Sequence, residues 1–118
     1  MKITKMLLSG ILMVGCLTGA AQASTWSQQH PRRAEVLRRD NRSLASVNAA
    51  RCHDNLTRGQ ARQLRHEDVA IRRQEQRDAA INGGYITKGQ QRFLNREENG
   101  VNRQMRRDEW VDSHSARP

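Results

Sequence analysis

The sequence contains few aromatic, proline and cysteine residues, and these scarcities limit what the chain can be. Aromatic residues are 3% of the 118 residues, with two Trp, one Tyr and one Phe. Proteins that bind single-stranded nucleic acid stack bases on several aromatic side chains, so no nucleic-acid partner is expected. Alternating runs of β-branched residues are also missing, and we therefore expect no strand. The fold class predicted from these absences is all-α.

Cysteine occurs only as Cys16 and Cys52. Because Cys16 lies in the N-terminal apolar segment, the rest of the chain has a single thiol and cannot form an intramolecular disulfide. Cys52 could link two copies of the chain outside the cytoplasm, so a homodimer stays open. The simpler alternative is an unreactive, tolerated residue.

The N-terminus has the layout of a cleavable signal peptide, residues 1–23. Lys2 and Lys5 precede an uncharged apolar run over residues 6–20, and small residues end at Ala23. This run of about 15 residues is shorter than the roughly 20 that cross a bilayer. We expect cleavage between Ala23 and Ser24, which predicts a periplasmic or secreted protein with no transmembrane anchor after cleavage. The alternative is a lipoprotein anchored at Cys16.

Residues 24–118 are long enough for one small helical domain. Without Lys2 and Lys5 they contain 19 basic and 12 acidic residues, for a net charge of +7, and every basic residue except Lys88 is Arg. Large apolar side chains are few, so the monomer is expected to be marginal in stability or completed by a partner. The longest of them are Leu37, Leu44, Leu64, Ile71, Phe93, Leu94, Val101, Met105 and Trp110.

Residues 55–84 and 85–114 form a repeat of thirty residues that aligns without gaps. Ten of the thirty positions are identical, and the first copy of each identical pair is Thr57, Gly59, Gln60, Arg62, Leu64, Glu67, Arg73, Gln74, Arg77 and Asp78. We interpret the two units as a tandem helical repeat.

Each unit begins with the Thr-x-x-Gln spacing of a helix capping box. Thr57 with Gln60, and Thr87 with Gln90, are predicted to exchange side-chain and backbone hydrogen bonds at the helix start. Apolar residues follow at helical spacing, and Asn82-Gly83-Gly84 ends the first unit. Because the connection is short, the two helices are expected to form an antiparallel pair.

A third helix is predicted upstream of the repeat. Ser27 is expected to cap it, Pro31 suits its first turn, and the pattern fades near residues 54–55. Its apolar stripe is predicted to consist of Ala34, Leu37, Leu44 and Val47. The architecture expected is thus a signal helix followed by about three amphipathic helices.

No catalytic, cofactor or metal site is expected. The serines and Cys52 have no recognisable motif around them, so we do not interpret the protein as an enzyme. The four histidines and Cys52 lack the spacing of a zinc site. Two acidic residues stand out for another reason, since Asp68 and Glu98 occupy equivalent repeat positions beside the apolar stripe. They are predicted to form partly buried ion pairs with arginines of a neighbouring helix.

The excess of arginine predicts a basic face. Its candidate residues are Arg72, Arg73, Arg103 and Arg107, with a solvated surface as the plain alternative. For an exported protein, the polyanions that fit are anionic lipid, lipopolysaccharide or a cell-wall polymer.

The stretch from Asn82 to Lys88, followed by Gln91, Leu94-Asn95 and residues 97–99, resembles a group of small exported proteins of Gram-negative bacteria with an NGGxITKxEQxxLNxxEN signature. His30-Pro31-Arg32-Arg33 and residues 71–75 are similar to it as well. The resemblance covers most of residues 24–118 and implies export and helicity rather than an activity. Gly89-Gln90 departs from it, because an acidic residue is usual after the Ile-Thr-Lys segment.

A shorter likeness links Leu56-Thr57 with Gln60, and Ile86-Thr87 with Gln90, to the periplasmic LTxxQ stress proteins, the Spy-like chaperones. This resemblance implies a basic helical dimer that holds unfolded client proteins without ATP. It covers about ten residues, which helix capping also explains. The leading hypothesis is accordingly a non-enzymatic helical protein that binds client or partner proteins in a chaperone-like role, and the alternative is a binder of envelope polyanions.

Overall fold

The computed structural model describes residues 25–115, and in this part the chain is all-α. Three long helices follow one another, α2 over Pro31–Cys52, α3 over Arg58–Ile81 and α4 over Lys88–Ser115, and residues 25–29 are also helical. No strand occurs between residues 25 and 115. The all-helical expectation is confirmed. The signal segment 1–23, the cleavage position between Ala23 and Ser24, and Cys16 lie outside the described residues.

The sequence suggested a helix capped by Ser27, but α2 begins at Pro31. The residue before the helix is His30, which has no side-chain cap, and its carbonyl accepts a hydrogen bond from the Ala34 amide at 2.9 Å. Proline suits this first position because its fixed φ is helical and its missing N–H has no intrahelical partner there. The segment before it makes a separate turn, in which the His30 amide donates to the Trp26 carbonyl at 2.9 Å.

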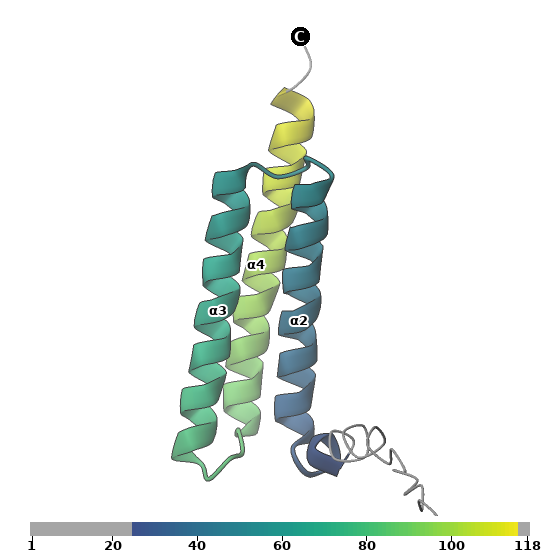
Figure 1. Ribbon diagram of the computed structural model, residues 1–118. Coiled ribbons are helices and arrows are strands. Elements are labelled where there is room, and N and C mark those ends of the chain that lie inside the picture. Colours follow the sequence, from purple (N-terminus) through teal and green to yellow (C-terminus); the bar gives the residue numbers. More distant parts are fainter. Residues whose placement is uncertain (1–24, 116–118) are drawn as a thin grey trace, which may run out of the picture.

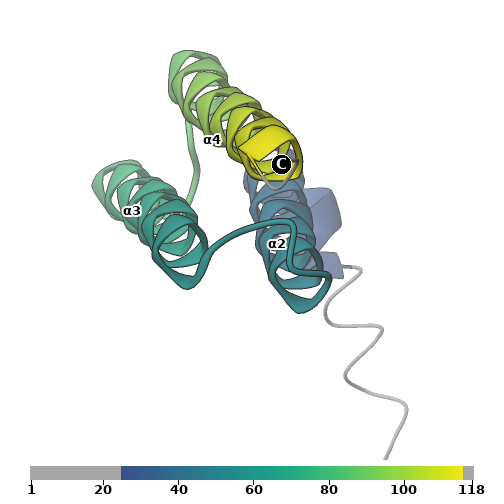
Figure 2. The same cartoon turned by 90° about the horizontal axis from the view of Figure 1, so that it is seen from above.

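The three long helices lie side by side, with the short connections at alternate ends (Figure 1). Viewed along the bundle, they occupy the corners of a triangle (Figure 2), and each of them contacts the other two. Within the described range 25–115, no helix is long and apolar enough to span a membrane.

Two glycines make the turn between α3 and α4. Gly83 has φ +65° and Gly84 has φ +98°, conformations that glycine adopts without the steric cost of a Cβ. The Gly84 amide donates to the Ala79 carbonyl at 2.7 Å, which satisfies one of the last carbonyls of α3. Asn82 also connects the two helices, because its Nδ2 donates a hydrogen bond to Gln90 Oε1 at 2.8 Å across the turn.

The interior of the bundle is a mixture of apolar and acidic side chains. In every helix most buried positions recur three and four residues apart, as expected of a face that packs against two neighbours. The apolar members of this cluster are Val36, Val47, Ala50, Leu56, Ala61, Leu64, Ile71, Ala79, Ile86, Leu94 and Val101. The buried polar members are Asp40, Ser43, Asp68, Glu75, Asp78 and Glu98.

Some apolar residues are placed differently from what their spacing indicated. In α2, Val36 is fully buried, whereas Leu37 and Leu44 are only half-buried. The prediction from the sequence placed these two leucines on the buried face. The buried face of α2 instead includes Asp40 and Ser43, which hydrophobic spacing cannot identify. Phe93 and Trp110 are 45% and 61% exposed, so neither belongs to the core.

An aromatic cluster joins the start of the described chain to the turn between α3 and α4. The His30 ring lies 5.2 Å from the Trp26 ring and 4.4 Å from the Tyr85 ring, between centroids. Arg33 holds the same region, because its Nη1 donates to the Gly84 carbonyl at 3.1 Å and its guanidinium lies over Trp26. Two segments far apart in the sequence, residues 30–33 and 82–88, are thus in contact.

Candidate functional site

The threonines and glutamines identified from the sequence lie at the starts of α3 and α4. Gln60 N donates to Thr57 Oγ1 at 3.2 Å, and Thr57 N donates to Gln60 Oε1 at 2.8 Å. At α4 the corresponding distances are 3.1 Å from Gln90 N to Thr87 Oγ1 and 2.8 Å from Thr87 N to Gln90 Oε1. These side chains satisfy amides that have no intrahelical partner, so their role here is structural.

A layer of acidic side chains crosses the middle of the bundle, and we call it the carboxylate layer. Each long helix contributes one member, Asp40 from α2, Asp68 from α3 and Glu98 from α4, and each is at most 1% exposed. Ser43 belongs to the same layer, since its Oγ donates to Asp68 Oδ2 at 3.0 Å.

Arginines reach the buried acids from neighbouring helices. Arg39 Nε donates to Glu98 Oε2 at 2.8 Å, which ties α2 to α4. Arg72 of α3 pairs with Asp40 of α2, and Arg33 of α2 pairs with Glu75 of α3. The expected interhelical ion pair is therefore present at Glu98. At Asp68 the expectation was wrong, because a serine hydroxyl takes the place of the arginine.

Some oxygen atoms of the carboxylate layer have no hydrogen-bond donor. Oδ1 of Asp40, Oδ1 of Asp68 and Oε1 of Glu98 are buried without a hydrogen-bond partner in the structure. Burial raises the pKa of Glu98 to about 7 and that of Asp68 to about 6, and the neighbouring carboxylates add to both shifts. Burial also raises the pKa of Asp40, against the opposing effect of Arg72. The carboxylates of the layer therefore retain protons to higher pH than exposed carboxylates do.

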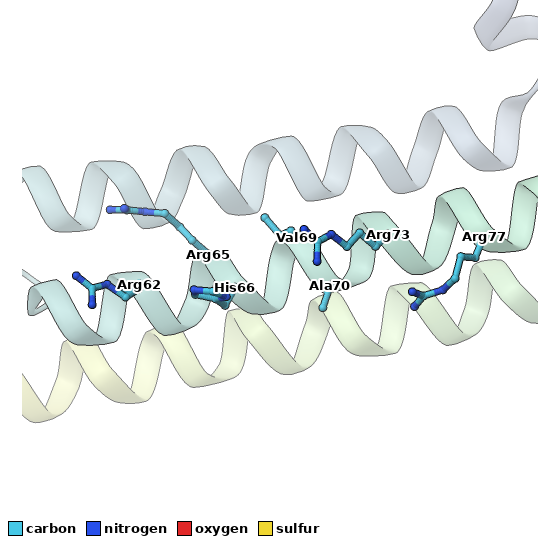
Figure 3. Close-up of a pocket in the computed structure, with 7 residues that line it drawn as sticks. All are labelled: Arg62, Arg65, His66, Val69, Ala70, Arg73 and Arg77. Carbon is cyan, nitrogen blue, oxygen red and sulfur yellow. The ribbon is translucent and has the colours of Figure 1, made fainter.

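Burial of acids in α3 leaves its outer face basic. Asp68, Glu75 and Asp78 are all buried, and Glu67 is half-buried toward α4. At 100° per residue, the exposed basic side chains fall within an arc of about 120° that contains no acidic residue. This α3 row consists of Arg58, Arg62, Arg65, His66, Arg73 and Arg77. Val69 and Ala70 lie between the cations and, with most of them, line a shallow pocket (Figure 3).

In α4, too, acidic and basic side chains lie on different sides of the helix. Glu98 is buried, while Asp108, Glu109 and Asp112 are half-buried on the sides turned toward the bundle. Glu97 is exposed, but it lines the groove between α3 and α4. The outward cations, which we call the α4 row, fall within an arc of about 100°. They are Lys88, Arg92, Arg96, Arg103, Arg106 and Arg107, and all are exposed.

The four arginines proposed from the sequence are divided by the structure. Arg73 belongs to the α3 row, and Arg103 and Arg107 belong to the α4 row. Arg72 instead pairs with Asp40 and donates to Asn41 Oδ1 at 2.6 Å, so its charge is neutralised within the bundle. Sequence reasoning missed Arg62, Arg65 and Arg77 as members of one face. Their spacing relative to Leu64 and Ile71, which fix the inward direction of α3, is the signal that could have identified them.

The groove between α3 and α4 exposes apolar surface. Phe93 lies at its edge, and Ala70, Ile71, Leu94 and Val101 contribute to its walls. This groove therefore presents several apolar side chains between two long helices.

The remaining candidates for chemistry are dispersed. Cys52 is exposed at the end of α2, and His53 follows it directly. His66 lies in the α3 row, and His114 stacks on Trp110 at a centroid distance of 4.2 Å. Over residues 25–115 no three His, Cys, Asp or Glu side chains are grouped so that they could hold a metal ion.

Comparison with protein-family models, with curated proteins and with solved structures finds no match to the chain. The candidate site consists of two arginine-rich outer faces on a bundle that buries five of its twelve acidic residues.

Proposed function

We propose that the protein is exported and, without being an enzyme, binds polyanions of the cell envelope through the α3 and α4 rows. The observation that supports this function is the separation of charge within the fold. Acidic residues are interspersed among the arginines in the sequence, but in α3 they are buried or turned aside. A polyanion that approaches the outer face of α3 meets cations without an acidic neighbour in the same arc.

The dimensions of the α3 row suit an extended or flat ligand. From Arg62 to Arg77 the row spans about 22 Å at 1.5 Å per residue. Arginine presents a planar fork of donors that matches phosphate oxygens, and such contacts release condensed counterions. Lipid phosphates, lipopolysaccharide and anionic cell-wall polymers all have this chemistry.

We further propose that the repeat of residues 55–84 and 85–114 is what builds the two rows. Three of its identical pairs are outward arginines, Arg62 with Arg92, Arg73 with Arg103, and Arg77 with Arg107. Inward positions are paired as well, since Leu64 and Leu94 are both fully buried. Each unit then supplies one basic helix face and one stripe for the core.

The test compares two double variants of residues 24–118 for binding to inorganic polyphosphate. Arg73→Gln/Arg77→Gln removes two charges four residues apart from the α3 row. Arg38→Gln/Arg42→Gln removes two exposed charges at the same spacing from α2, where Glu35 is nearby. We expect the first variant to weaken binding by about tenfold and the second by much less, with unchanged helical circular dichroism for both. Equal losses would mean that net charge alone attracts the polyanion, and the assignment to this face would be wrong.

A second function, holding unfolded or partner proteins, is favoured by the groove between α3 and α4. Phe93 and its apolar neighbours give this groove a surface that an unfolded segment could cover. If the protein acts in this way, it should slow the aggregation of a denatured client at equimolar concentration, and Phe93→Ser should reduce the effect. No effect of the wild-type protein on aggregation would eliminate this function.

A further inference from the structure

Among residues 25–115, no other element covers the outer side of the C-terminal end of α4. α4 has 28 residues, whereas α2 has 22 and α3 has 24. Its last turns extend beyond the connection between α2 and α3 (Figure 1). Near this end, Gln60 Nε2 donates to Asp112 Oδ1 at 3.4 Å and joins the start of α3 to the bundle side of α4.

The outer side of this end combines cations with a tryptophan. Arg103, Arg106 and Arg107 belong to the α4 row, and Trp110 continues the same arc with 61% of its surface exposed. His114 stacks on Trp110 and supports the ring. The acidic residues of these turns, Asp108, Glu109 and Asp112, are half-buried on other sides of the helix. We call Arg103, Arg106, Arg107 and Trp110 the α4 tip.

We propose that the α4 tip docks on the surface of an anionic phospholipid bilayer, with the indole of Trp110 in the headgroup region. This inference rests on the proposed function and narrows its ligand to the phosphates of a lipid surface. Three arginines supply the attraction to the anionic surface, and its strength falls off within a Debye length.

The tryptophan is the feature that distinguishes a lipid surface from a linear polyanion. A linear chain of phosphates can be bound by the cations of the two rows and offers nothing to an exposed indole. A bilayer presents phosphates and an apolar boundary within a few ångströms of each other, where an amphipathic ring is favoured. The apolar stripe of α4 is occupied by the core of the bundle, so only the tip approaches the lipid.

The experiment uses residues 24–118 with Trp26→Phe, which leaves Trp110 as the sole tryptophan. Its fluorescence is recorded with vesicles of phosphatidylcholine containing about one third phosphatidylglycerol, and with vesicles of phosphatidylcholine alone. We expect a blue shift only with the anionic vesicles, reversed by 0.5 M salt. Since each arginine near an anionic surface contributes about fivefold in affinity, Arg103→Gln/Arg106→Gln/Arg107→Gln should weaken vesicle binding on the order of a hundredfold.

The matched control removes three exposed arginines of α2, Arg32→Gln/Arg38→Gln/Arg42→Gln, and should weaken binding by less than about fivefold. Polyphosphate binding is measured in parallel. If polyphosphate binds through the α3 row while Trp110 shows no shift on anionic vesicles, the docking proposal is wrong and the proposed function stands. If neither ligand binds, both are wrong. A shift that is equal on neutral vesicles, or that follows protein concentration without vesicles, would also overturn the docking proposal.

Discussion

Glu98→Gln is expected to stabilise the protein at alkaline pH. Glu98 is 1% exposed, and one of its carboxylate oxygens has no donor. Glutamine has nearly the same shape as the protonated acid, and its amide oxygen can still accept a hydrogen bond from Arg39 Nε. The substitution thus removes a charge from the interior without opening a cavity.

The magnitude follows from the shift of the pKa. The pKa of Glu98 is raised from 4.5 to about 7, and one unit corresponds to about 1.4 kcal/mol, so ionisation in the folded state costs about 3 kcal/mol. Because the folded-state pKa is the higher one, the full stability is present below pH 4.5 and is lost as pH rises through 7. Asp68, raised from 3.8 to about 6, adds a loss of the same sign between those values.

The assay is urea denaturation of residues 24–118 at pH 5 and pH 8, followed by circular dichroism. Wild-type protein should be less stable at pH 8 than at pH 5. Glu98→Gln should show a smaller decrease and be more stable than wild type at pH 8 by about 3 kcal/mol. Glu97→Gln removes a carboxylate from the adjacent, exposed position and should leave the pH dependence unchanged. A wild-type stability that increases from pH 5 to pH 8, or equal behaviour of the two variants, would show that ionisation of Glu98 does not destabilise the fold.

Three further predictions concern the free energy of unfolding at one pH. Leu64→Ala, at a fully buried position, should lower it by about 2–5 kcal/mol. Phe93→Ala, at an exposed position, should lower it by less than about 1 kcal/mol, and a larger loss would place Phe93 in the core. Thr87→Ala should cost about 1 kcal/mol through loss of the cap, and Thr87→Ser should restore most of it; equal losses would exclude the hydroxyl as the cause. Gly100→Ala should stabilise α4 by up to about 1 kcal/mol, since a Cβ there meets only Arg103 at 3.9 Å. Gly84→Ala should destabilise the protein, because φ at this position is +98°. The opposite signs would contradict the helical position of Gly100 and the turn geometry of Gly84.

Much of the fold follows from local signals in the sequence. The starts of α3 and α4 lie directly after Thr57 and Thr87, and α3 ends before Gly83, because capping and left-handed turns depend on a few adjacent residues. The start of α2 was less predictable, since Ser27 and Pro31 both signal a helix start and only the chain direction around His30 distinguishes them.

The interior was harder to predict than the helices. Hydrophobic periodicity locates Leu64, Leu94 and Val101, but it cannot locate Asp40 or Glu75, whose burial depends on arginines of another helix. For the same reason Arg72 was assigned to a basic face, although it pairs with the buried Asp40 of α2. Whether a charged residue faces inward is decided by a partner that is distant in the sequence, and helix packing determines which partners meet.

The outward arginines of α3 and α4, beside acidic residues that are buried or turned aside, are proposed to bind phosphate-bearing polyanions. The decisive measurement is the dissociation constant for inorganic polyphosphate at several salt concentrations, with wild type and with Arg73→Gln/Arg77→Gln. We expect wild-type binding to weaken steeply with salt and the variant to show a shallower slope, because fewer counterions are released. Binding that is indifferent to salt, or identical slopes for the two proteins, would contradict this proposal.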